Sequence, residues 1–420
     1  YSITSIKKAF KTQSEDLDNT YLITFSDKNE IDDIISILEE KHFVDYVEKI
    51  PIYELFYTPN DPQLVQQWNL NTIQAELAWN TSTGNTNVVV AVTDDAVQTT
   101  HQDLSANIFI NSNEIPGNGI DDDNNGYIDD VNGWDAANND NNPNPINFNN
   151  DHGTHVSGIV AAATDNNIGI ASIGFNVKIL PVKIGNSPSG SLIGAFSGLD
   201  YAINCGFTDV INMSWGGGSY SFTMQNLFNA ANAANIVLVA AAGNSNTSAP
   251  MYPASYNHVI SVGATNVSDQ RSFFSNYGST IDVMAPGSNI LSTEVNATNN
   301  AYGIKSGTSM ASPLIAGLAG LILSNTPNLT PTQVENCLES SCDNIDAQNS
   351  GFIGQIGAGR INAFQALECF NIPPVSNFNS TLINACTNQS IQFNDLSAGS
   401  GITNWLWNFG DGNTSTLQYP

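Results

Sequence analysis

Short apolar runs that alternate with helical stretches are the feature that most constrains the fold of this chain. The apolar runs are residues 88–92, 178–182, 210–214, 236–240 and 259–263, and the helical stretches are residues 155–163, 192–204 and 220–235. Because strands that are apolar on both sides need cover on both faces, the alternation predicts an α/β domain with a mainly parallel sheet. Functional side chains in such a domain gather at the carboxyl ends of the strands.

The segment before this region has a different pattern. Residues 1–57 hold most of the lysines, and their pattern predicts a separate small α+β domain with strands over residues 21–25 and 47–56 and a helix over residues 30–41. Prolines and polar turn residues at 58–62 interrupt this pattern and indicate a domain boundary.

The segment after the large region differs again. From residue 371 onward, period-two runs and the Asp411-Gly412 turn signal predict part of a β-sandwich. We therefore expect three domains, at residues 1–57, 58–370 and 371–420, of which the middle one is the large α/β domain.

Charge and hydropathy narrow the possible partners. The chain has 11 Lys and Arg residues against 39 Asp and Glu residues, so its formal net charge is −28 and nucleic acids and anionic membranes are poor partners. No apolar run reaches the ~18 residues that span a bilayer, so we expect no membrane span. With only five cysteines, we expect no disulfide scaffold but one disulfide among Cys337, Cys342 and Cys369 if the protein is secreted.

Polar side chains stand where predicted strands give way to a loop or a helix, at Asp94, His152, Asn244 and Ser309. A serine hydroxyl is a weak nucleophile near neutral pH, so acyl transfer needs an imidazole to take its proton and a carboxylate to orient that imidazole. An asparagine adds an N–H donor that, with the backbone N–H of the serine, would stabilise an oxyanion. These residue types together predict nucleophilic catalysis.

The residues around Ser309 favour the same chemistry. Gly307 frees the backbone to turn, Thr308 is a good helix cap, and the small-residue stretch 314–323 predicts a helix with Ser309 in its first turn. Because the first N–H groups of a helix lack helical partners, an anion that forms there is stabilised.

Segments in the same order resemble those of the subtilisin-like (subtilase) serine proteases. They are residues 90–94, 101–104, 152–156, 212–216, 242–244, 282–287 and 307–313. The resemblance implies a subtilisin-like α/β fold and a secreted serine endopeptidase that works through an acyl-enzyme. It implies that Asp94 orients His152, which acts as general base and then general acid. It also implies that Ser309 attacks and that Asn244 completes the oxyanion hole.

The family pattern decides between neighbouring candidates. It favours His152 over His155, which we interpret as a packed helix residue, and Asp94 over Asp95. Asp95-Ala96 departs from the Ser or Thr and the Gly that usually follow the catalytic aspartate. A second carboxylate facing the site would raise the pKa of the imidazole, but we expect the Asp95 side chain to point away.

The resemblance also implies a binding site for an extended peptide. The matching residues are Ser189, Gly190, Ser214, Trp215, Gly216, Ala242 and Gly243. Met251 stands at a position that is usually small at the floor of the pocket for the side chain before the scissile bond. We therefore expect a preference for medium-sized apolar side chains over lysine or arginine.

An acidic insertion predicts calcium binding. Residues 118–130 place oxygen ligands on alternate positions before a glycine turn, much as EF-hand-type loops do, and a solvated loop without calcium is the alternative. The candidate ligands there are Asp121, Asp123, Asn125, Asp129 and Asp130. By resemblance, a second calcium site would include Asp135 and Asp140, and the strong calcium site of the family would include Asp103 and Asn166.

Both flanking segments also have a counterpart in the family. The first resembles a propeptide, which would inhibit the enzyme as an intramolecular partner until it is cut near residues 56–61, and the last resembles a PKD domain through residues 405–412.

Protein or peptide substrates and a secreted or cell-surface location are expected, with any secretion signal upstream of Tyr1. The alternative function is a catalytically silent adhesion protein on a protease fold. An esterase would need a Gly-x-Ser-x-Gly elbow, which residues 307–311 do not provide.

Overall fold

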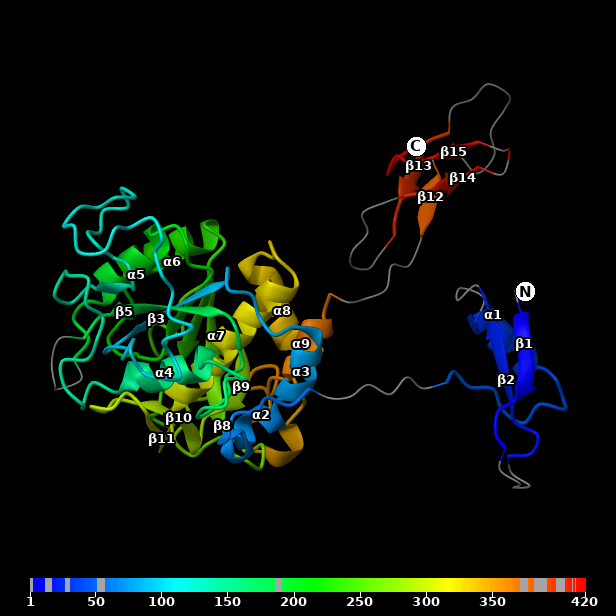
Figure 1. Ribbon diagram of the computed structural model, residues 1–420, viewed down its shortest axis with the longest axis horizontal. Helices are drawn as coiled ribbons and strands as arrows, with labels where there is room; N and C mark the ends of the chain where they lie inside the picture. The colour runs from blue at the N-terminus through cyan, green and yellow to red at the C-terminus, as the bar shows by residue number, and fades with distance from the viewer. Residues whose placement is uncertain are drawn as a thin grey trace. The chain divides into compact units, whose positions relative to one another are not determined.

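The computed structural model describes residues 3–11, 17–26, 31–50, 57–185, 191–370, 377–380, 391–397, 405–409, 411 and 413–420. The chain divides into two compact units, Tyr1–Leu55 and Phe56–Pro420. In the first unit, strands β1 (Ile3–Lys8) and β2 (Tyr21–Phe25) pair in antiparallel fashion, and helix α1 (Ile31–Glu39) follows (Figure 1).

The second strand predicted for this first unit is wrong where it can be checked. Residues 47–50 form no strand, and residues 51–56 lie outside the described residues. Strand β1, which the sequence pattern does not predict, pairs with β2.

A seven-stranded parallel sheet forms the centre of the second unit, with the strand order β4-β5-β3-β6-β7-β8-β9. Its strands are β3 (Val89–Asp94), β4 (Trp134–Asp135), β5 (Lys178–Lys183), β6 (Val210–Met213), β7 (Val237–Ala241), β8 (Val259–Thr265) and β9 (Val283–Pro286). The predicted apolar runs form β3, β5, β6, β7 and β8, whereas the short strands β4 and β9 were not predicted. The predicted α/β fold is confirmed.

Helices cover both faces of this sheet (Figure 1). The side chains of β3 alternate between the two faces: Val90 and Val92 belong to one hydrophobic core, and Val89 and Ala91 belong to the other. The first core also contains residues of α4 (His152–Ala161) and α7 (Thr308–Asn325), and the second contains residues of α5 (Ala195–Asn204) and α6 (Phe222–Ala233). A strand buried on both sides explains why β3 is apolar without alternation.

Helix α7 is the central helix of the first core. By length and composition it could cross a membrane, yet 83% of it is buried inside the protein, as expected for a core helix. Its glycines permit this burial, because a Cβ added to Gly317 would lie 2.6 Å from Ile173 Cγ2 and 2.8 Å from Val160 O. Among the described residues, no other helix is long and apolar enough for a membrane span.

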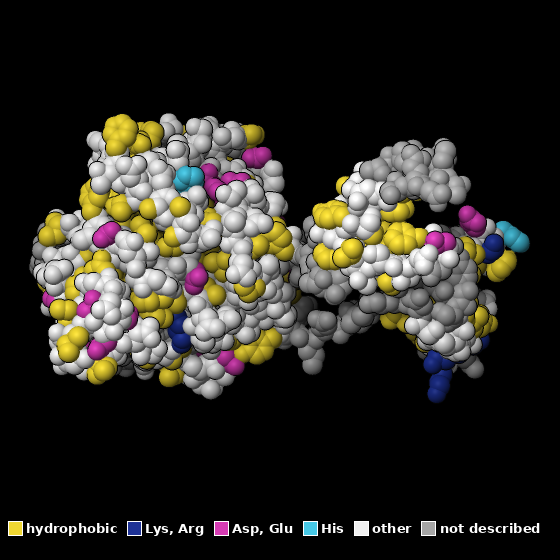
Figure 2. Space-filling view, turned by 90° about the horizontal axis from the view of Figure 1, so that it is seen from above, with side chains coloured by type: hydrophobic (Ala, Val, Ile, Leu, Met, Phe, Trp, Pro, Cys, Tyr) yellow, Lys and Arg dark blue, Asp and Glu magenta, His cyan; other side chains and the backbone are white. Residues whose placement is uncertain are grey.

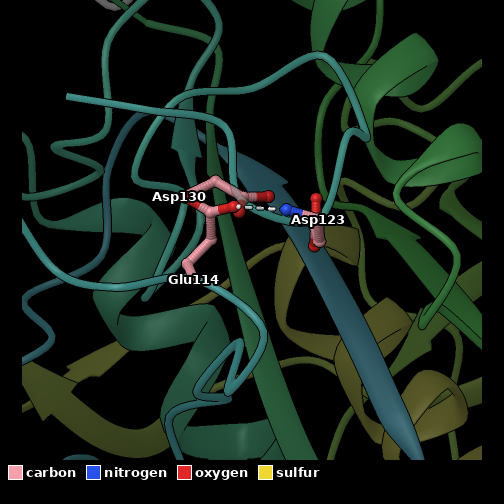
Figure 3. Close-up of side chains that lie close together, drawn as sticks. All are labelled: Glu114, Asp123 and Asp130. Atoms are coloured by element: carbon pink, nitrogen blue, oxygen red, sulfur yellow. Dashed lines mark hydrogen bonds between the residues drawn. The ribbon is translucent and has the colours of Figure 1, made fainter. Parts of the chain in front are cut away.

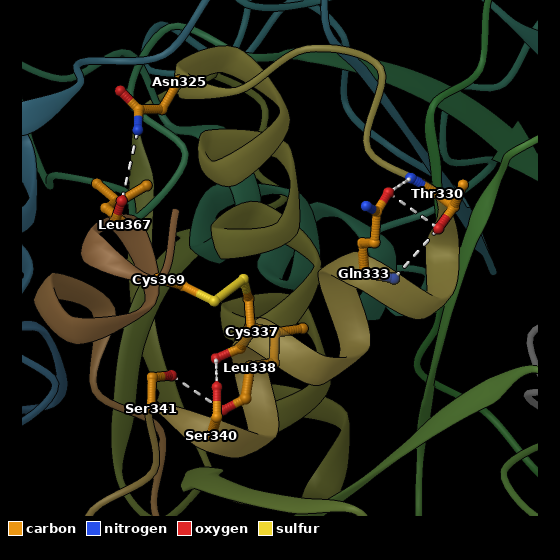
Figure 4. Close-up of a disulfide and its surroundings, with 9 residues drawn as sticks. All are labelled: Asn325, Thr330, Gln333, Cys337, Leu338, Ser340, Ser341, Leu367 and Cys369. Atoms are coloured by element: carbon orange, nitrogen blue, oxygen red, sulfur yellow. Dashed lines mark hydrogen bonds between the residues drawn. A yellow bond between two sulfur atoms is a disulfide. The ribbon is translucent and has the colours of Figure 1, made fainter. Parts of the chain in front are cut away.

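Smaller elements complete the second unit. They are the helices η2 (Leu64–Gln66), α2 (Trp68–Thr72), α3 (Ala75–Thr81), α8 (Pro331–Ser340), η3 (Asp346–Gln348) and α9 (Ala363–Glu368), and the hairpin of β10 (Ile290–Glu294) and β11 (Ala301–Lys305). A disulfide joins Cys337 of α8 to Cys369, directly after α9 (Figure 4). This bond confirms the expectation of one disulfide, and Cys342 remains a thiol.

Short antiparallel pairs follow near the carboxyl terminus. Strand β12 (Phe378–Ser380) pairs with β13 (Phe393–Asp395), and β14 (Trp407–Asn408) pairs with β15 (Thr414–Ser415). The second pair encloses the predicted Asp-Gly turn, of which Gly412 lies outside the described residues. Part of a β-sandwich remains a prediction for this segment.

Candidate active site

The Asp94 carboxylate and the His152 imidazole lie in contact. Asp94 is the last residue of β3, His152 is the first residue of α4, and Asp94 Oδ1 lies 2.8 Å from His152 Nδ1. The absence of a side chain at Gly153 permits this approach, because an added Cβ would lie 2.4 Å from Ala96 O and 2.7 Å from Asp94 Cβ. The sheet and the helix thus bring together two residues that are 58 positions apart.

Hydrogen bonding fixes the tautomer of His152. A carboxylate only accepts hydrogen bonds, so the contact with Asp94 Oδ1 requires a proton on Nδ1 and leaves the lone pair of the neutral imidazole on Nε2. Burial disfavours the charged imidazolium, but the charge and hydrogen bond of Asp94 and the charge of Asp95 outweigh burial and raise the pKa of His152 to about 9. Lys305 opposes this shift with its positive charge.

Ser309 lies in the first turn of α7, as predicted. The helix begins at Thr308, and its N-cap is Gly307 rather than Thr308, with no side-chain capping bond. The Ser309 hydroxyl donates a hydrogen bond to Ser214 O at 3.0 Å, and none of the described hydrogen bonds joins it to His152. Because a serine side chain has a single heavy-atom rotor, a change of χ1 is the movement that can redirect this hydroxyl.

The Asn244 side chain is held against the start of α7. Its Oδ1 accepts hydrogen bonds from the backbone N–H of Thr308 at 2.8 Å and from the Thr308 hydroxyl at 3.0 Å. With its oxygen bound in this way, the amide has Nδ2 left as a donor, and a Cβ added to Gly307 would lie 3.4 Å from that nitrogen. The amide donor therefore lies beside a helix turn whose backbone N–H groups lack helical partners.

Buried polar groups connect β6 to α7 behind these side chains. Asn212 accepts a hydrogen bond from the Ser312 hydroxyl at 2.7 Å and donates one to Ser214 Oγ at 2.9 Å. Ser214 Oγ in turn donates to Ser309 O at 2.9 Å. The motif segments contain these residues, but their spacing alone does not reveal that they hold the serine turn against the sheet.

Asp95 faces the amino end of α4, so the expectation that its side chain points away is wrong. Its Oδ1 accepts hydrogen bonds from the backbone N–H groups of Gly153 at 2.8 Å and Ala96 at 2.7 Å, and its Oδ2 lies 3.4 Å from the backbone nitrogen of His152. Burial and the charge of Asp94 raise the pKa of Asp95 to about 6, and the hydrogen bonds oppose this shift. The physical reason for its orientation is that unpaired N–H groups at a helix start attract a carboxylate.

Met251 packs against glycines of the predicted substrate-binding segments. A Cβ added to Gly216 would lie 3.3 Å from Met251 Cγ, and one added to Gly243 would lie 3.1 Å from Met251 Cε. Trp215 Nε1 donates a hydrogen bond to Thr93 O at 3.0 Å, which ties this segment to β3.

The structure describes some of the other predicted substrate-binding residues and not others. Ser214 directly follows β6, and Ala242 directly follows β7, so both lie at carboxyl ends of the sheet. Ser189 and Gly190 lie outside the described residues.

The acidic insertion brings carboxylates together that could hold a cation (Figure 3). One oxygen each of Glu114, Asp123 and Asp130 lies within 4.8 Å of the others. Asn111 Nδ2 donates hydrogen bonds to Asp123 Oδ2 and Asp130 Oδ1, both at 2.8 Å. Burial raises the pKa of Asp130, although its hydrogen bonds oppose the shift. The sequence pattern does not single out Glu114, because this residue precedes the alternating motif.

The remaining predicted ligands of this loop accept hydrogen bonds from nearby backbone. Asp121 Oδ1 accepts from the backbone N–H of Asn125 at 3.1 Å, and Asp129 Oδ2 accepts from that of Gly119 at 3.0 Å. Asn125 Nδ2 donates to Asp130 Oδ2 at 3.1 Å. N–H groups of the loop thus donate hydrogen bonds to its own carboxylates and offset much of their negative charge.

Asp135 forms a buried ion pair with Lys183, and their side chains are only 1% and 2% exposed. Asp135 also accepts a hydrogen bond from Asn138 Nδ2 at 2.8 Å, and its backbone N–H donates to Asp140 O at 2.7 Å. The charge of Asp135 is therefore balanced within the chain, which removes the electrostatic reason to expect a calcium ion at this carboxylate.

Asp103 and Asn166, which the resemblance assigns to one calcium site, are hydrogen-bonded to each other, and Asp61 lies close to Asn166. Asn166 Nδ2 donates a hydrogen bond to Asp103 Oδ1 at 2.8 Å, and Asp61 Oδ2 accepts one from the backbone N–H of Asp165 at 2.8 Å. Burial raises the pKa of Asp103 to about 6, hydrogen bonds from Ile170 and Asn166 oppose the shift, and the charge of Asp61 adds to it. Asp61 lies in the proline-rich boundary segment of residues 58–62, and only its acidity marks it in the sequence as a candidate ligand.

The excess of acidic over basic residues in the sequence also appears on the protein surface. On the face that Figure 2 shows, acidic side chains are scattered among polar and hydrophobic ones, whereas Lys and Arg side chains are few.

Comparisons with known proteins identify the family of this chain. Residues 85–359 match the model of the subtilase family. The chain is 37% identical over 314 residues to thermitase from Thermoactinomyces vulgaris, a match that covers 74% of this chain and 100% of thermitase. It is 38% identical over 371 residues to an extracellular protease from Xanthomonas campestris, covering 81% of this chain and 62% of that relative. A solved protease structure from Pseudoalteromonas arctica aligns with a TM-score of 0.61 and 32% identity over 74% of this chain and 99% of that one. The chain therefore belongs to the subtilase family and is a serine endopeptidase.

Proposed function

We propose that Asp94, His152 and Ser309 form the catalytic triad of this endopeptidase and that Asn244 donates to its oxyanion hole. The observation that carries the proposal is the 2.8 Å contact between Asp94 Oδ1 and His152 Nδ1 at the carboxyl end of β3. This contact keeps the proton on Nδ1 and the lone pair on Nε2, which is the state that a general base needs.

The reaction requires the Ser309 hydroxyl to turn from Ser214 O toward His152. Ser309 Oγ then attacks the carbonyl carbon of the scissile bond while its proton passes to His152 Nε2. The oxyanion accepts hydrogen bonds from Asn244 Nδ2 and the backbone N–H of Ser309. When the C–N bond breaks, the imidazolium gives its proton to the leaving amine, and an acyl-enzyme remains. Water hydrolyses this ester by the same proton transfers, while Asp94 stays ionised and stabilises the imidazolium.

Met251 supports a preference for a medium-sized apolar side chain before the scissile bond. Its contacts with Gly216 and Gly243 support an apolar floor for this pocket. A cavity of about 220 Å³ beside Trp215, which Tyr252 also lines, suits a further apolar side chain of an extended peptide. A cleavage profile led by lysine or arginine would contradict this preference.

Calcium is the cation that best fits the acidic loop. Glu114, Asp123 and Asp130 offer the hard oxygen ligands that calcium takes, and a cation among them would offset their mutual repulsion. Asp103 and Asn166, whose side chains lie 2.8 Å apart and which have Asp61 nearby, would offer a second donor set of the same chemistry. The ion would stabilise the folded loops, and no step of the reaction passes through it.

The flanking segments suit a secreted proenzyme. The separate compact unit Tyr1–Leu55 supports a propeptide that inhibits the enzyme until it is cut near residues 56–61. The antiparallel strand pairs after residue 377 support a partial PKD-like module, so the domains would be residues 1–57, 58–370 and 371–420. The Cys337–Cys369 disulfide and the extracellular relative support secretion.

Substitution of the nucleophile tests the catalytic proposal. We expect Ser309→Ala to lower kcat/KM for a peptide substrate by ~10³-fold or more and to leave the first unit uncut. Ser105→Ala is the matched control, because this serine is exposed and lies outside the site. Full activity of Ser309→Ala would refute the triad.

A further inference from the structure

We propose that Asp95 is a positioning residue for His152, whose catalytic role is the one proposed above. Its carboxylate holds the amino end of α4 against the end of β3 and adds a negative charge beside the imidazole. Asp95 touches no reacting atom, so it would act through His152 alone.

Helix α4 is capped from another element rather than by its own N-cap residue. The N-cap is Asp151, which makes no side-chain capping bond and instead pairs with Lys305 Nζ at 2.8 Å. Asp95, directly after β3, takes the capping place, with Oδ1 2.8 Å from the backbone nitrogen of Gly153 and Oδ2 3.4 Å from that of His152. A negative charge at this end of a helix is also favoured by the helix dipole.

The Asp95 carboxylate is fixed in this place. Asp95 is only 8% exposed, and its Oδ1 also accepts a hydrogen bond from the backbone N–H of Ala96 at 2.7 Å. His152 is thus tied to the end of β3 twice, through its side chain to Asp94 and through its backbone to Asp95. Loss of the second tie would let the start of the helix move and would misdirect Nε2, and small misplacements of a catalytic group are costly.

The charge of Asp95 acts on the same imidazole. Titratable groups from several elements surround His152. Asp94 and Asp95 lie at the end of β3, Asp151 is the N-cap of α4, and His155 lies within α4. Glu294 is on β10 and Lys305 is on β11. Lys305 pairs with Asp151 and lies 3.7 Å from Glu294, and burial keeps His155 neutral by lowering its pKa to about 3. Removal of the Asp95 charge alone should therefore lower the pKa of His152.

Two variants of the full chain separate the hydrogen bonds of Asp95 from its charge. Asp95→Asn keeps an oxygen acceptor for the helix but loses the charge, whereas Asp95→Ala loses both. Asp200→Asn is the control for the charge change, because Asp200 is an exposed residue of α5. We would measure kcat and KM across pH with a peptide substrate, count active sites with a fluorophosphonate and record thermal melting.

We expect Asp95→Asn to move the acid limb of kcat/KM to lower pH by about half a unit or more, with kcat on the plateau close to the wild-type value. Asp95→Ala should show the same shift and also lose ~10-fold in kcat per titrated site, with little change in KM. Asp200→Asn should show neither effect. Counting active sites separates this loss from simple unfolding.

An unmoved acid limb in Asp95→Asn, or a wild-type kcat per site in Asp95→Ala, would overturn the inference. Loss of activity in Ser309→Ala together with wild-type behaviour of both Asp95 variants would refute the role of Asp95 alone. Full activity in Ser309→Ala would refute the proposed function itself.

Discussion

The proposed catalytic cluster (Asp94, His152, Asn244 and Ser309) and the acidic loop (residues 118–130) both gather polar side chains, but they are built in different ways. In the catalytic cluster, partners come from different elements, as where Asp94 of β3 contacts His152 of α4. In the acidic loop, many carboxylates accept hydrogen bonds from their own segment, as where Asp129 accepts from the backbone of Gly119. The fold itself therefore holds the proposed catalytic residues in place, whereas local bonds and, in our proposal, a cation hold the loop.

This difference predicts separate consequences for rate and stability. A substitution in the catalytic cluster should lower the rate while the sheet and α7 keep the fold. Loss of a cation from the loop should lower stability and leave the rate of each folded site nearly unchanged.

Asp94→Asn should have the largest effect on rate. The amide can donate a hydrogen bond to Nδ1 and so favour the wrong tautomer of His152, which should cost ~10⁴-fold in kcat. Far-ultraviolet circular dichroism should show an unchanged fold. A loss below tenfold would contradict the proposed triad, because it would mean that the contact between Asp94 and His152 does not serve the reaction.

Asn244→Ala should have the next largest effect. Removal of one oxyanion donor should lower kcat by ~10²–10³-fold with little change in KM, because the donor matters most in the transition state. Steady-state kinetics on a short peptide measure both constants. A rise in KM at constant kcat would instead assign Asn244 to ground-state binding.

Chelation should act on stability rather than on rate. Removal of calcium with EDTA should lower the melting temperature by about 5 °C or more, and added calcium should restore it. Asp130→Asn should reduce this response, whereas Asp411→Asn, at an exposed residue outside the loop, should not. A melting temperature that responds to neither chelator nor calcium would contradict the proposal that a cation stabilises the loop.

The pH profile should show a smaller but directional effect. Because the pKa of His152 is raised from 6.5 to about 9, the imidazolium persists to higher pH. The neutral base form appears only above the pH range in which an ordinary histidine loses its proton. The acid limb of kcat/KM should therefore lie above pH 6.5. The same proton stabilises the fold below pH 6.5, and this contribution is lost as pH rises through about 9. An acid limb below 6.5 would contradict the charge arrangement around the imidazole.

The large elements of the fold could be predicted because each carries its own pattern. The runs that form β3 and β8 are continuous and apolar, and α7 follows a glycine turn. Strand β9 escaped prediction because it has four residues and ends in Pro286. The strand predicted over residues 47–56 shows the opposite failure in its described part, because residues 47–50 form no strand.

The candidate site was predictable where a motif assigns a residue its partner and not where no motif does. The Asp94 contact follows from strand ends and from the resemblance. The turn of Asp95 toward Gly153, 58 positions away, does not, because no periodicity encodes a cap that comes from another element. The same holds for the ion pair of Asp135 with Lys183.

The residue that reacts with a fluorophosphonate tests the triad most directly. Peptide mapping by mass spectrometry should find the adduct on Ser309 in the wild-type protein, and His152→Ala should slow its formation by ~10³-fold or more. Undiminished labelling of Ser309→Ala, or an adduct on another residue, would contradict the triad.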